Sequence, residues 1–176
     1  MQSIRSFVRV AQLLSRDRKL LILQFLTVII LVALDQITKL WIVTNIPLYS
    51  GFSAIEKVFS IYHTVNTGAG WSLLSGQTAL LIAVPVVAVI AMVYVLTTEK
   101  IKPKTGVWGI TLILAGAVGN LIDRIFRGGE VVDMIKLEFI DFPVFNVADI
   151  CVTVGAVLFF IYVIFFYEDR KEKKDE

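Results

Sequence analysis

Four long apolar runs dominate the chain, and shorter stretches rich in charged and polar residues separate them. The runs cover about residues 20–43, 73–96, 106–125 and 144–167, and the third is rich in Gly and Ala. A helix needs roughly 20 mostly apolar residues to cross a membrane, because each residue adds about 1.5 Å towards a hydrocarbon core of about 30 Å. The pattern therefore predicts an all-α polytopic membrane protein with four transmembrane helices.

The first run follows Arg16, Arg18 and Lys19, which is also the charge pattern of a secretory signal peptide. However, the run is longer than the apolar part of a signal peptide, and no small-residue cleavage site follows it. We interpret it as a retained membrane anchor.

Two of the segments between the runs have the pattern of β-strands. Residues 57–65 alternate and are rich in β-branched and aromatic side chains, as expected for a half-buried strand. Residues 127–133 and 135–142 are expected to form a hairpin-like continuation. We therefore expect a small β platform, built from the segments 44–72 and 126–143, at one end of the helices.

The composition fits one membrane domain. Hydrophobic residues make up 57% of the 176 residues and charged residues only 18%, against about 25% charged residues in a soluble domain. The length predicts a single domain over residues 20–167, between a basic N-terminal tail at 1–19 and a charged tail at 168–176. The formal charge of +2 is too small to predict nucleic-acid binding. Cys151 is the one cysteine, so no disulfide within the chain is possible.

The positions of Lys and Arg predict how the spans are oriented. Twelve of the 17 lie in the N-terminal tail, in the link between the second and third runs, and in the C-terminal tail. Because cytoplasmic flanks are enriched in Lys and Arg, both termini and this link are expected on the cytoplasmic side. The β platform then faces outward.

Polar residues near the outer ends of three runs are the candidates for function. Asp35 and Lys39 share one face of the first run, since they lie four residues apart. Others share a face of the third or fourth run or close the first outer segment: Gly116, Asn120, Asp123, Arg124, Asn146, Asp149, Thr153 and Asn66. A charge at the bilayer centre costs about 2.5–3.5 kcal/mol on insertion scales, so such residues usually face the bundle interior. Their convergence at one depth favours a functional site.

Each of these residues also has a structural explanation. Asp35 and Lys39 can form a helical ion pair, with the Lys39 side chain reaching outward to the interface. Asn146 can cap the fourth helix while Asp149 complements the helix dipole. Likewise, Arg124 can anchor the third helix at the interface. Asn120 can hydrogen-bond between helices in a seam of small residues.

The residue types limit the possible chemistry. A metal site requires clustered ligands, which His63 and Cys151 do not supply at distant positions, so no metal or other cofactor is expected. No serine or cysteine has an evident partner base, and there is no Gly-rich phosphate loop.

Paired carboxylates remain. If Asp133 and Asp149 converge, they would share a proton, because repulsion and desolvation raise one pKa of such a pair. The ionised member could then take a proton from water while the protonated member polarises a peptide carbonyl. Spacing alone does not exclude four competing carboxylates, which are Asp35, Asp123, Glu130 and Asp141.

Five blocks of the sequence, in order, resemble the lipoprotein signal peptidase (signal peptidase II) family of bacterial membrane aspartyl proteases. The blocks are DQITK at 35–39, NTGAGWS at 66–72, GAVGNLIDR at 116–124, VVD at 131–133 and FNVAD at 145–149. The resemblance covers about residues 20–167. A single block would be weak, but five in order at the predicted outer ends of four spans are highly specific. One departure is Gly70, where the family commonly has Ala.

The resemblance implies an enzyme of the bacterial plasma membrane with an extracytoplasmic β cradle. It implies that Asp133 and Asp149 are the catalytic pair, and that Asn66 and Arg124 hold the substrate main chain. The surrounding pocket would comprise Asp35, Lys39, Asn66, Gly116, Asn120, Asp123, Arg124, Asn146 and Ala148. The implied substrates are prolipoproteins, cut beside membrane lipids on the N-terminal side of a diacylglyceryl-modified cysteine, and the implied inhibitor is the cyclic peptide globomycin.

Two other classes of protein would also carry intramembrane charges. A small transporter or proton-relay protein would need polar groups through the full depth of the spans, whereas here they cluster at one end. An assembly factor without chemistry would leave the placement of Asp133 and Asp149 without a purpose. The enzyme is therefore the favoured interpretation.

Overall fold

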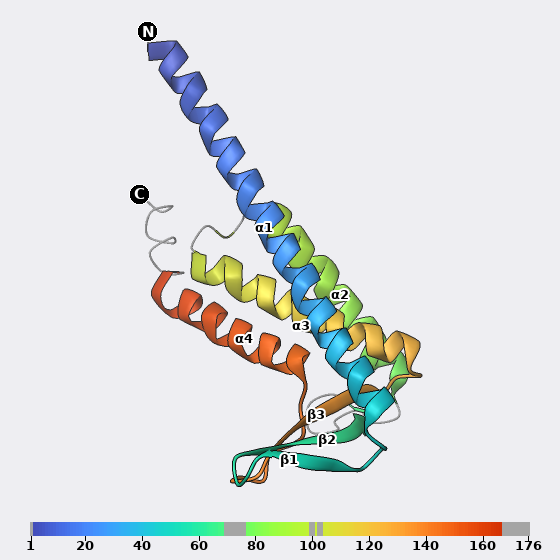
Figure 1. Cartoon of the computed structure of the whole chain (residues 1–176). Helices are drawn as coiled ribbons and strands as arrows, with labels where there is room; N and C mark the ends of the chain where they lie inside the picture. The colour runs from blue at the N-terminus through green and yellow to red at the C-terminus, as the bar shows by residue number, and fades with distance from the viewer. Residues whose placement is uncertain (1, 69–76, 99–100, 102–103, 167–176) are drawn as a thin grey trace.

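Four long helices carry a small β-sheet at one end (Figure 1). The computed structural model describes residues 2–68, 77–98, 101 and 104–166. The helices are α1 (Gln2–Asn45), α2 (Thr78–Thr97), α3 (Lys104–Phe126) and α4 (Val147–Phe166). Each contains a stretch long and apolar enough to cross a membrane. The prediction of four transmembrane helices with a β platform is confirmed.

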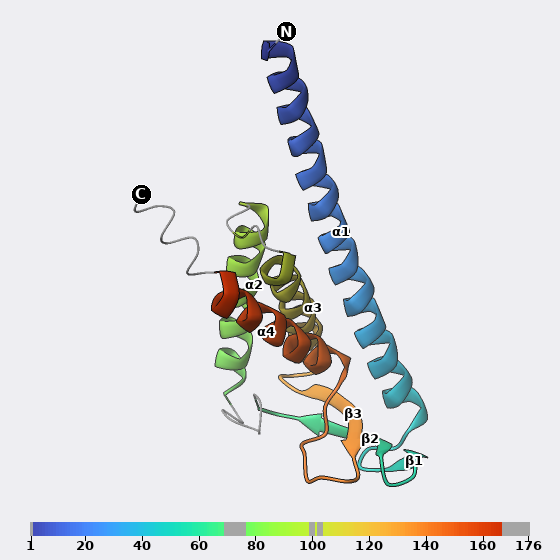
Figure 2. The ribbon, with the colours of Figure 1, turned by 90° about the vertical axis from the view of Figure 1, so that its left-hand side faces the viewer.

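The helix ends differ from the predicted ends for local reasons. α1 runs back to Gln2, so the segment predicted as a basic tail continues the helix beyond the other three (Figure 2). α4 begins at Val147 rather than at 144, because Phe145 bridges to a strand and Asn146 caps the helix. Residues 73–76 of the second predicted span and the predicted tail at 168–176 lie outside the described residues.

The platform is a three-stranded antiparallel sheet with the order β1 (Gly51–Ile55), β2 (Phe59–Asn66) and β3 (Val131–Leu137). β2 pairs Thr64 with Asp133, so the central strand fixes the position of Asp133 on its neighbour. His63 on β2 is buried, and its Nδ1 lies 2.7 Å from the carbonyl oxygen of Ile46 just after α1. The sheet is therefore tied to the end of the first helix.

The sheet corrects the sequence prediction in two places. The strand expected at 57–65 is β2, but it begins at Phe59 because Lys57 lies in the β1–β2 turn with a φ of 62°. The hairpin-like continuation at 127–133 and 135–142 is wrong in form, since β3 is one continuous strand whose further pairing is a single bridge from Ile135 to Phe145.

α3 is the central helix of the bundle. Half of its most apolar window is buried, against 11–22% for the other three spans. Its core residues Ile110 and Leu114 lie in one cluster with Val28 of α1 and Leu96 of α2. On its other side α3 approaches α4 closely. A Cβ added to Gly116 would meet the carbonyl oxygen of Ala148, which shows how close the two backbones are.

The bundle is apolar outside and polar at one place inside. Ile30, Val87 and Phe160 on three different helices are each more than 60% exposed, as expected for side chains that face lipid. By contrast, Lys39 and Asp123 have no exposed surface. Charged side chains buried in this way mark the functional part of a membrane protein.

Candidate active site

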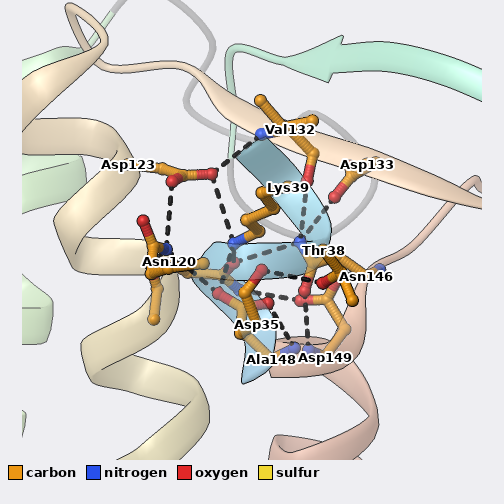
Figure 3. Close-up of polar contacts among 12 residues, drawn as sticks. Asp35, Thr38, Lys39, Asn120, Asp123, Val132, Asp133, Asn146, Ala148 and Asp149 are labelled. Atoms are coloured by element: carbon orange, nitrogen blue, oxygen red, sulfur yellow. Dashed lines mark hydrogen bonds and ion pairs between the residues drawn. The ribbon is translucent and has the colours of Figure 1, made fainter. Parts of the chain in front are cut away.

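The polar ends of α1, α3 and α4 meet beside β3. Figure 3 shows that side chains from all four elements point towards one another there: Asp35, Lys39, Asn120, Asp123, Asp133, Asn146 and Asp149. The convergence expected from the sequence is thus present in the structure.

Lys39 lies at the centre of a buried ionic cluster. Its ammonium nitrogen lies 2.9 Å from Oδ2 of Asp35 and 3.2 Å from Oδ2 of Asp123, and it donates a 2.9 Å hydrogen bond to Oδ1 of Asn120. The alternative in which Lys39 reaches outward to the interface is wrong, because its side chain is fully buried. Buried charges need such close pairing, since an unpaired one costs several kcal/mol.

Gln36, which was not among the residues predicted for the site, connects the members of this cluster. Its Nε2 lies within 3.1 Å of Oδ2 of Asp35 and of the carbonyl oxygen of Gly119, and within 3.2 Å of Oδ1 of Asp123. The sequence does contain one indication, since Gln36 lies between Asp35 and Lys39 in a mostly apolar run.

Asn146 and Asp149 form a reciprocal cap on α4. Oδ1 of Asn146 accepts the N–H of Asp149 at 3.0 Å, and Oδ2 of Asp149 accepts the N–H of Asn146 at 3.1 Å. This arrangement is a capping box, so the structural explanation considered for these residues is present. It leaves Nδ2 of Asn146 and Oδ1 of Asp149 for other contacts.

Those remaining atoms join the two aspartates. Nδ2 of Asn146 donates to Oδ1 of Asp133 at 2.6 Å and also lies 3.1 Å from Oδ1 of Asn120. Nδ2 of Asn120 in turn donates to Oδ1 of Asp149 at 2.8 Å. Two asparagines therefore hold Asp133 and Asp149 in one hydrogen-bonded network.

Asp133 is held as a weak acid. Burial raises the pKa of its carboxyl from 3.8 to about 7, and the negative charge of Asp149 acts in the same direction. The hydrogen bond from Asn146, the charge of Lys39 and a hydrogen bond from Asn66 oppose this rise in the pKa. Asp133 can consequently hold a proton close to neutral pH.

A cavity of about 460 Å³ opens beside the two aspartates. Its polar lining consists of Asn66, Asn120, Arg124, Asp133, Asp149 and Thr153. The rest is an apolar wall from β3, the loop after it and the start of α4: Val131, Leu137, Phe142, Pro143, Val144, Phe145, Ile150, Val152 and Val154. Apolar walls with a few convergent polar groups are typical of ligand sites.

The cavity separates the predicted site residues into two groups. Five of them line it, and the other six do not: Asp35, Lys39, Gly116, Asp123, Asn146 and Ala148. The competing carboxylates Glu130 and Asp141 do not line it either. Among the described residues, Asp133 and Asp149 are therefore the two carboxylates that line the cavity.

Arg124 has hydrogen-bonding capacity to spare. Its Nη2 donates to the carbonyl oxygen of Gly68 at 3.0 Å, and Oδ1 of Asn66 accepts the N–H of the same glycine at 2.9 Å. Within the described part of the chain, Nε of Arg124 is buried without a hydrogen-bond partner. Residues 69–72 of the NTGAGWS block, which include Gly70, lie outside the described residues.

Comparisons with known proteins identify the family of the chain. The family model described as signal peptidase (SPase) II matches residues 27–165. The chain is 40% identical over 160 residues to the lipoprotein signal peptidase of Enterococcus faecalis, covering 89% of this chain and 97% of the relative. It is 44% identical over 144 residues to that of Lactococcus lactis subsp. lactis, covering 81% and 94%.

Solved structures share the fold of the chain. Two of them, described as bacterial membrane enzyme structures by the in meso method at 2.3 and 1.9 Å resolution, superpose with TM-scores of 0.75 and 0.74. Both are 34% identical, and the matches cover 87% and 81% of this chain and 92% and 93% of those chains. The transporter interpretation is not favoured by any of these matches. The chain belongs to the signal peptidase II family.

Proposed function

We propose that the chain is an aspartic endopeptidase in which Asp133 and Asp149 remove the signal peptides of prolipoproteins. Cleavage falls on the N-terminal side of a diacylglyceryl-modified cysteine. One observation carries the proposal. Both carboxylates line the same cavity, and Asn146 contacts both of them.

The reaction follows from one proton shared by the pair. Asp149 accepts hydrogen bonds on both oxygens, whereas burial favours the protonated form of Asp133. Asp149 takes a proton from a water molecule, whose oxygen attacks the peptide carbon while Asp133 gives its proton to the carbonyl oxygen. When the resulting diol collapses, the proton on Asp149 passes to the leaving amine and Asp133 regains its own.

The cavity offers a place for the chain on each side of the scissile bond. Arg124 and Asn66 would bind the substrate main chain, since both line the cavity and a guanidinium group carries several N–H donors. The apolar wall at Phe142–Phe145 and Ile150 would accept the apolar signal segment. The acyl chains of the substrate would remain in the lipid beside α4.

The site would lie at the outer face of the bacterial plasma membrane, with both termini cytoplasmic. Basic residues at the opposite ends of the spans support this orientation. Large apolar side chains at the tip of the platform are exposed, namely Ile55, Val58, Phe139 and Ile140. Glu138 joins the two segments that carry them by accepting the N–H of Lys57 at 2.8 Å. This tip would rest in the membrane interface.

Reconstituted enzyme tests the substrate class. The purified chain in proteoliposomes is expected to cleave a lipidated precursor, with mass spectrometry placing the cut before the lipidated cysteine. The matched control is the same precursor without its lipid, which should be cleaved far more slowly. A globomycin-type cyclic peptide is expected to compete with the lipidated precursor. Equal rates on the two precursors would contradict the proposed substrate.

A further inference from the structure

Each carboxylate paired with Lys39 also holds a backbone N–H group beside a proposed catalytic aspartate. Oδ1 of Asp35 accepts the N–H of Ala148 at 2.9 Å, and Ala148 immediately precedes Asp149. Oδ2 of Asp123 accepts the N–H of Val132 at 3.0 Å, and Val132 immediately precedes Asp133. One ammonium group is thus connected to both catalytic segments through one carboxylate each (Figure 3).

The third contact of Lys39 leads directly to Asp149. Oδ1 of Asn120 accepts a hydrogen bond from Lys39, and Nδ2 of the same amide donates to Asp149. Because an ammonium group can only donate, it requires the oxygen of Asn120 on its side and leaves the N–H groups for Asp149. Asn146 reinforces this orientation by donating to the same amide oxygen.

We propose that Lys39, Asp35 and Asp123 form a positioning triad that sets the separation of Asp133 and Asp149. The three N–H bonds of the ammonium match its three acceptors, so Lys39 is held in one place. The triad comes from α1 and α3, whereas the aspartates lie on β3 and α4. The buried charge of Lys39 therefore fixes the positions of two separate elements, β3 and α4. This inference rests on the proposed catalytic role of Asp133 and Asp149.

Stability alone does not explain the triad. Replacing buried ion pairs by apolar side chains of similar volume is often neutral or stabilising, because pairing only offsets the cost of desolvation. Nor do the three residues contact substrate, since none lines the cavity. Gly119 leaves room for the Asp35 side chain. Any other residue there would place its Cβ 2.7 Å from Oδ2 of Asp35.

The Asp35→Asn variant tests the proposal with little change in size. The new amide can turn its oxygen to Ala148 or to Lys39 but loses part of the other contact, while Lys39 stays paired with Asp123. A displacement of about 1 Å at reacting groups can cost about 100-fold, so kcat on a lipidated precursor should fall at least about tenfold, with KM within about threefold. The double variant Lys39→Met with Asp35→Asn keeps the net charge and should lose more.

Leu114→Ala is the matched control for stability. Leu114 is 2% exposed in the core of the bundle, away from the cavity lining. Its truncation should lower the melting temperature in detergent and leave kcat within about threefold below that temperature. A folded Asp35→Asn variant whose kcat also stays within about threefold would overturn the positioning role.

If Asp35→Asn does not fold, a variant that removes no charge tests the proposal instead. Gln36→Leu removes the brace between Asp35 and Asp123 without removing a charge, so kcat should fall about fivefold at unchanged KM. An unchanged kcat would overturn the proposal. The catalytic pair is tested separately, because inactive Asp133→Asn together with a fully active Asp35→Asn would reject the triad alone. Activity in Asp133→Asn would reject the pair itself.

Discussion

Asn146 uses every polar atom that it has at the site. Its backbone N–H and side-chain oxygen cap α4 together with Asp149, and its side-chain nitrogen reaches Asp133. A residue with only a capping role would not need the last contact. One side chain therefore begins a helix and joins two carboxylates at the same time.

The sequence predicted which polar residues are buried, but not which partners they contact. Helical spacing alone placed Asp35 with Lys39, because both residues lie on one helix. It could not pair Asp35 with Ala148, since that contact joins residues 113 positions apart. Nor could it choose Asp133 from the competing carboxylates, because the choice depends on which side chains face the cavity.

The raised pKa of Asp133 predicts how stability depends on pH. The pKa of Asp133 in the folded protein, about 7, lies above the unfolded value of 3.8. The neutral carboxyl therefore makes its full contribution to stability at pH values below the unfolded pKa. That contribution is lost as the pH rises through about 7. The Asp133→Asn variant is always neutral at this position and should melt higher than wild type at pH 8, with almost no difference at pH 4.

Thermal unfolding in detergent at several pH values measures this difference. Comparing the two proteins at each pH cancels the titration of shared groups that do not interact with residue 133. A wild type that gains stability over Asp133→Asn between pH 4 and pH 8 would show that the carboxyl is not held as a weak acid.

At the element scale, the close approach of α3 and α4 places the site. Gly116 on α3 lies against Ala148 in the first turn of α4, and Gly109 lies against α4 about two turns further away. Because glycine has no Cβ, the two backbones can approach at both points. The Gly- and Ala-rich composition of the third run suggested such a seam, but not which helix it would meet.

Gly116→Ala and Gly109→Ala form a matched pair of variants. An added Cβ would lie 2.7 Å from Val152 Cγ2 at Gly116 and 2.7 Å from the Phe159 nitrogen at Gly109, so both should lower the melting temperature. Only Gly116→Ala moves the turn that carries Asp149, so it alone should lower kcat, by roughly 10- to 100-fold. Equal kcat values for the two variants would argue against this seam as a support of the site.

The sheet was harder to predict than the helices. β2 carries an alternating pattern of large side chains, whereas β1 reads GFSAI and all five of its residues are exposed. An exposed edge strand buries no face, so no periodicity marks it in the sequence. The form of β3 was missed because its partner is the distant β2, not the segment that follows it.

At the scale of the whole molecule, the apolar outside and the polar inside place the protein in a membrane, and the charge distribution predicts its orientation. Hydropathy predicted the four spans well because a lipid-facing helix must be apolar over its whole length. It contains no information about which carboxylates meet, since that depends on how the spans pack.

Single-cysteine labelling tests the orientation. With the buried Cys151 replaced by Ala, cysteines at the exposed positions Lys57 and Lys104 probe opposite ends of the spans. A membrane-impermeant maleimide should label Lys57→Cys in intact cells and Lys104→Cys only after the membrane is opened. The reverse pattern would place the site on the cytoplasmic side.

The most direct test of the catalytic pair is single-turnover cleavage of a lipidated precursor by Asp133→Asn and Asp149→Asn. Asp141→Asn is the matched control, because Asp141 is exposed and does not line the cavity. Either catalytic variant should lose at least about 1,000-fold in rate while remaining folded, and the control should stay within about twofold of wild type. Near-normal cleavage by a folded Asp133→Asn or Asp149→Asn variant would contradict the catalytic role of this pair.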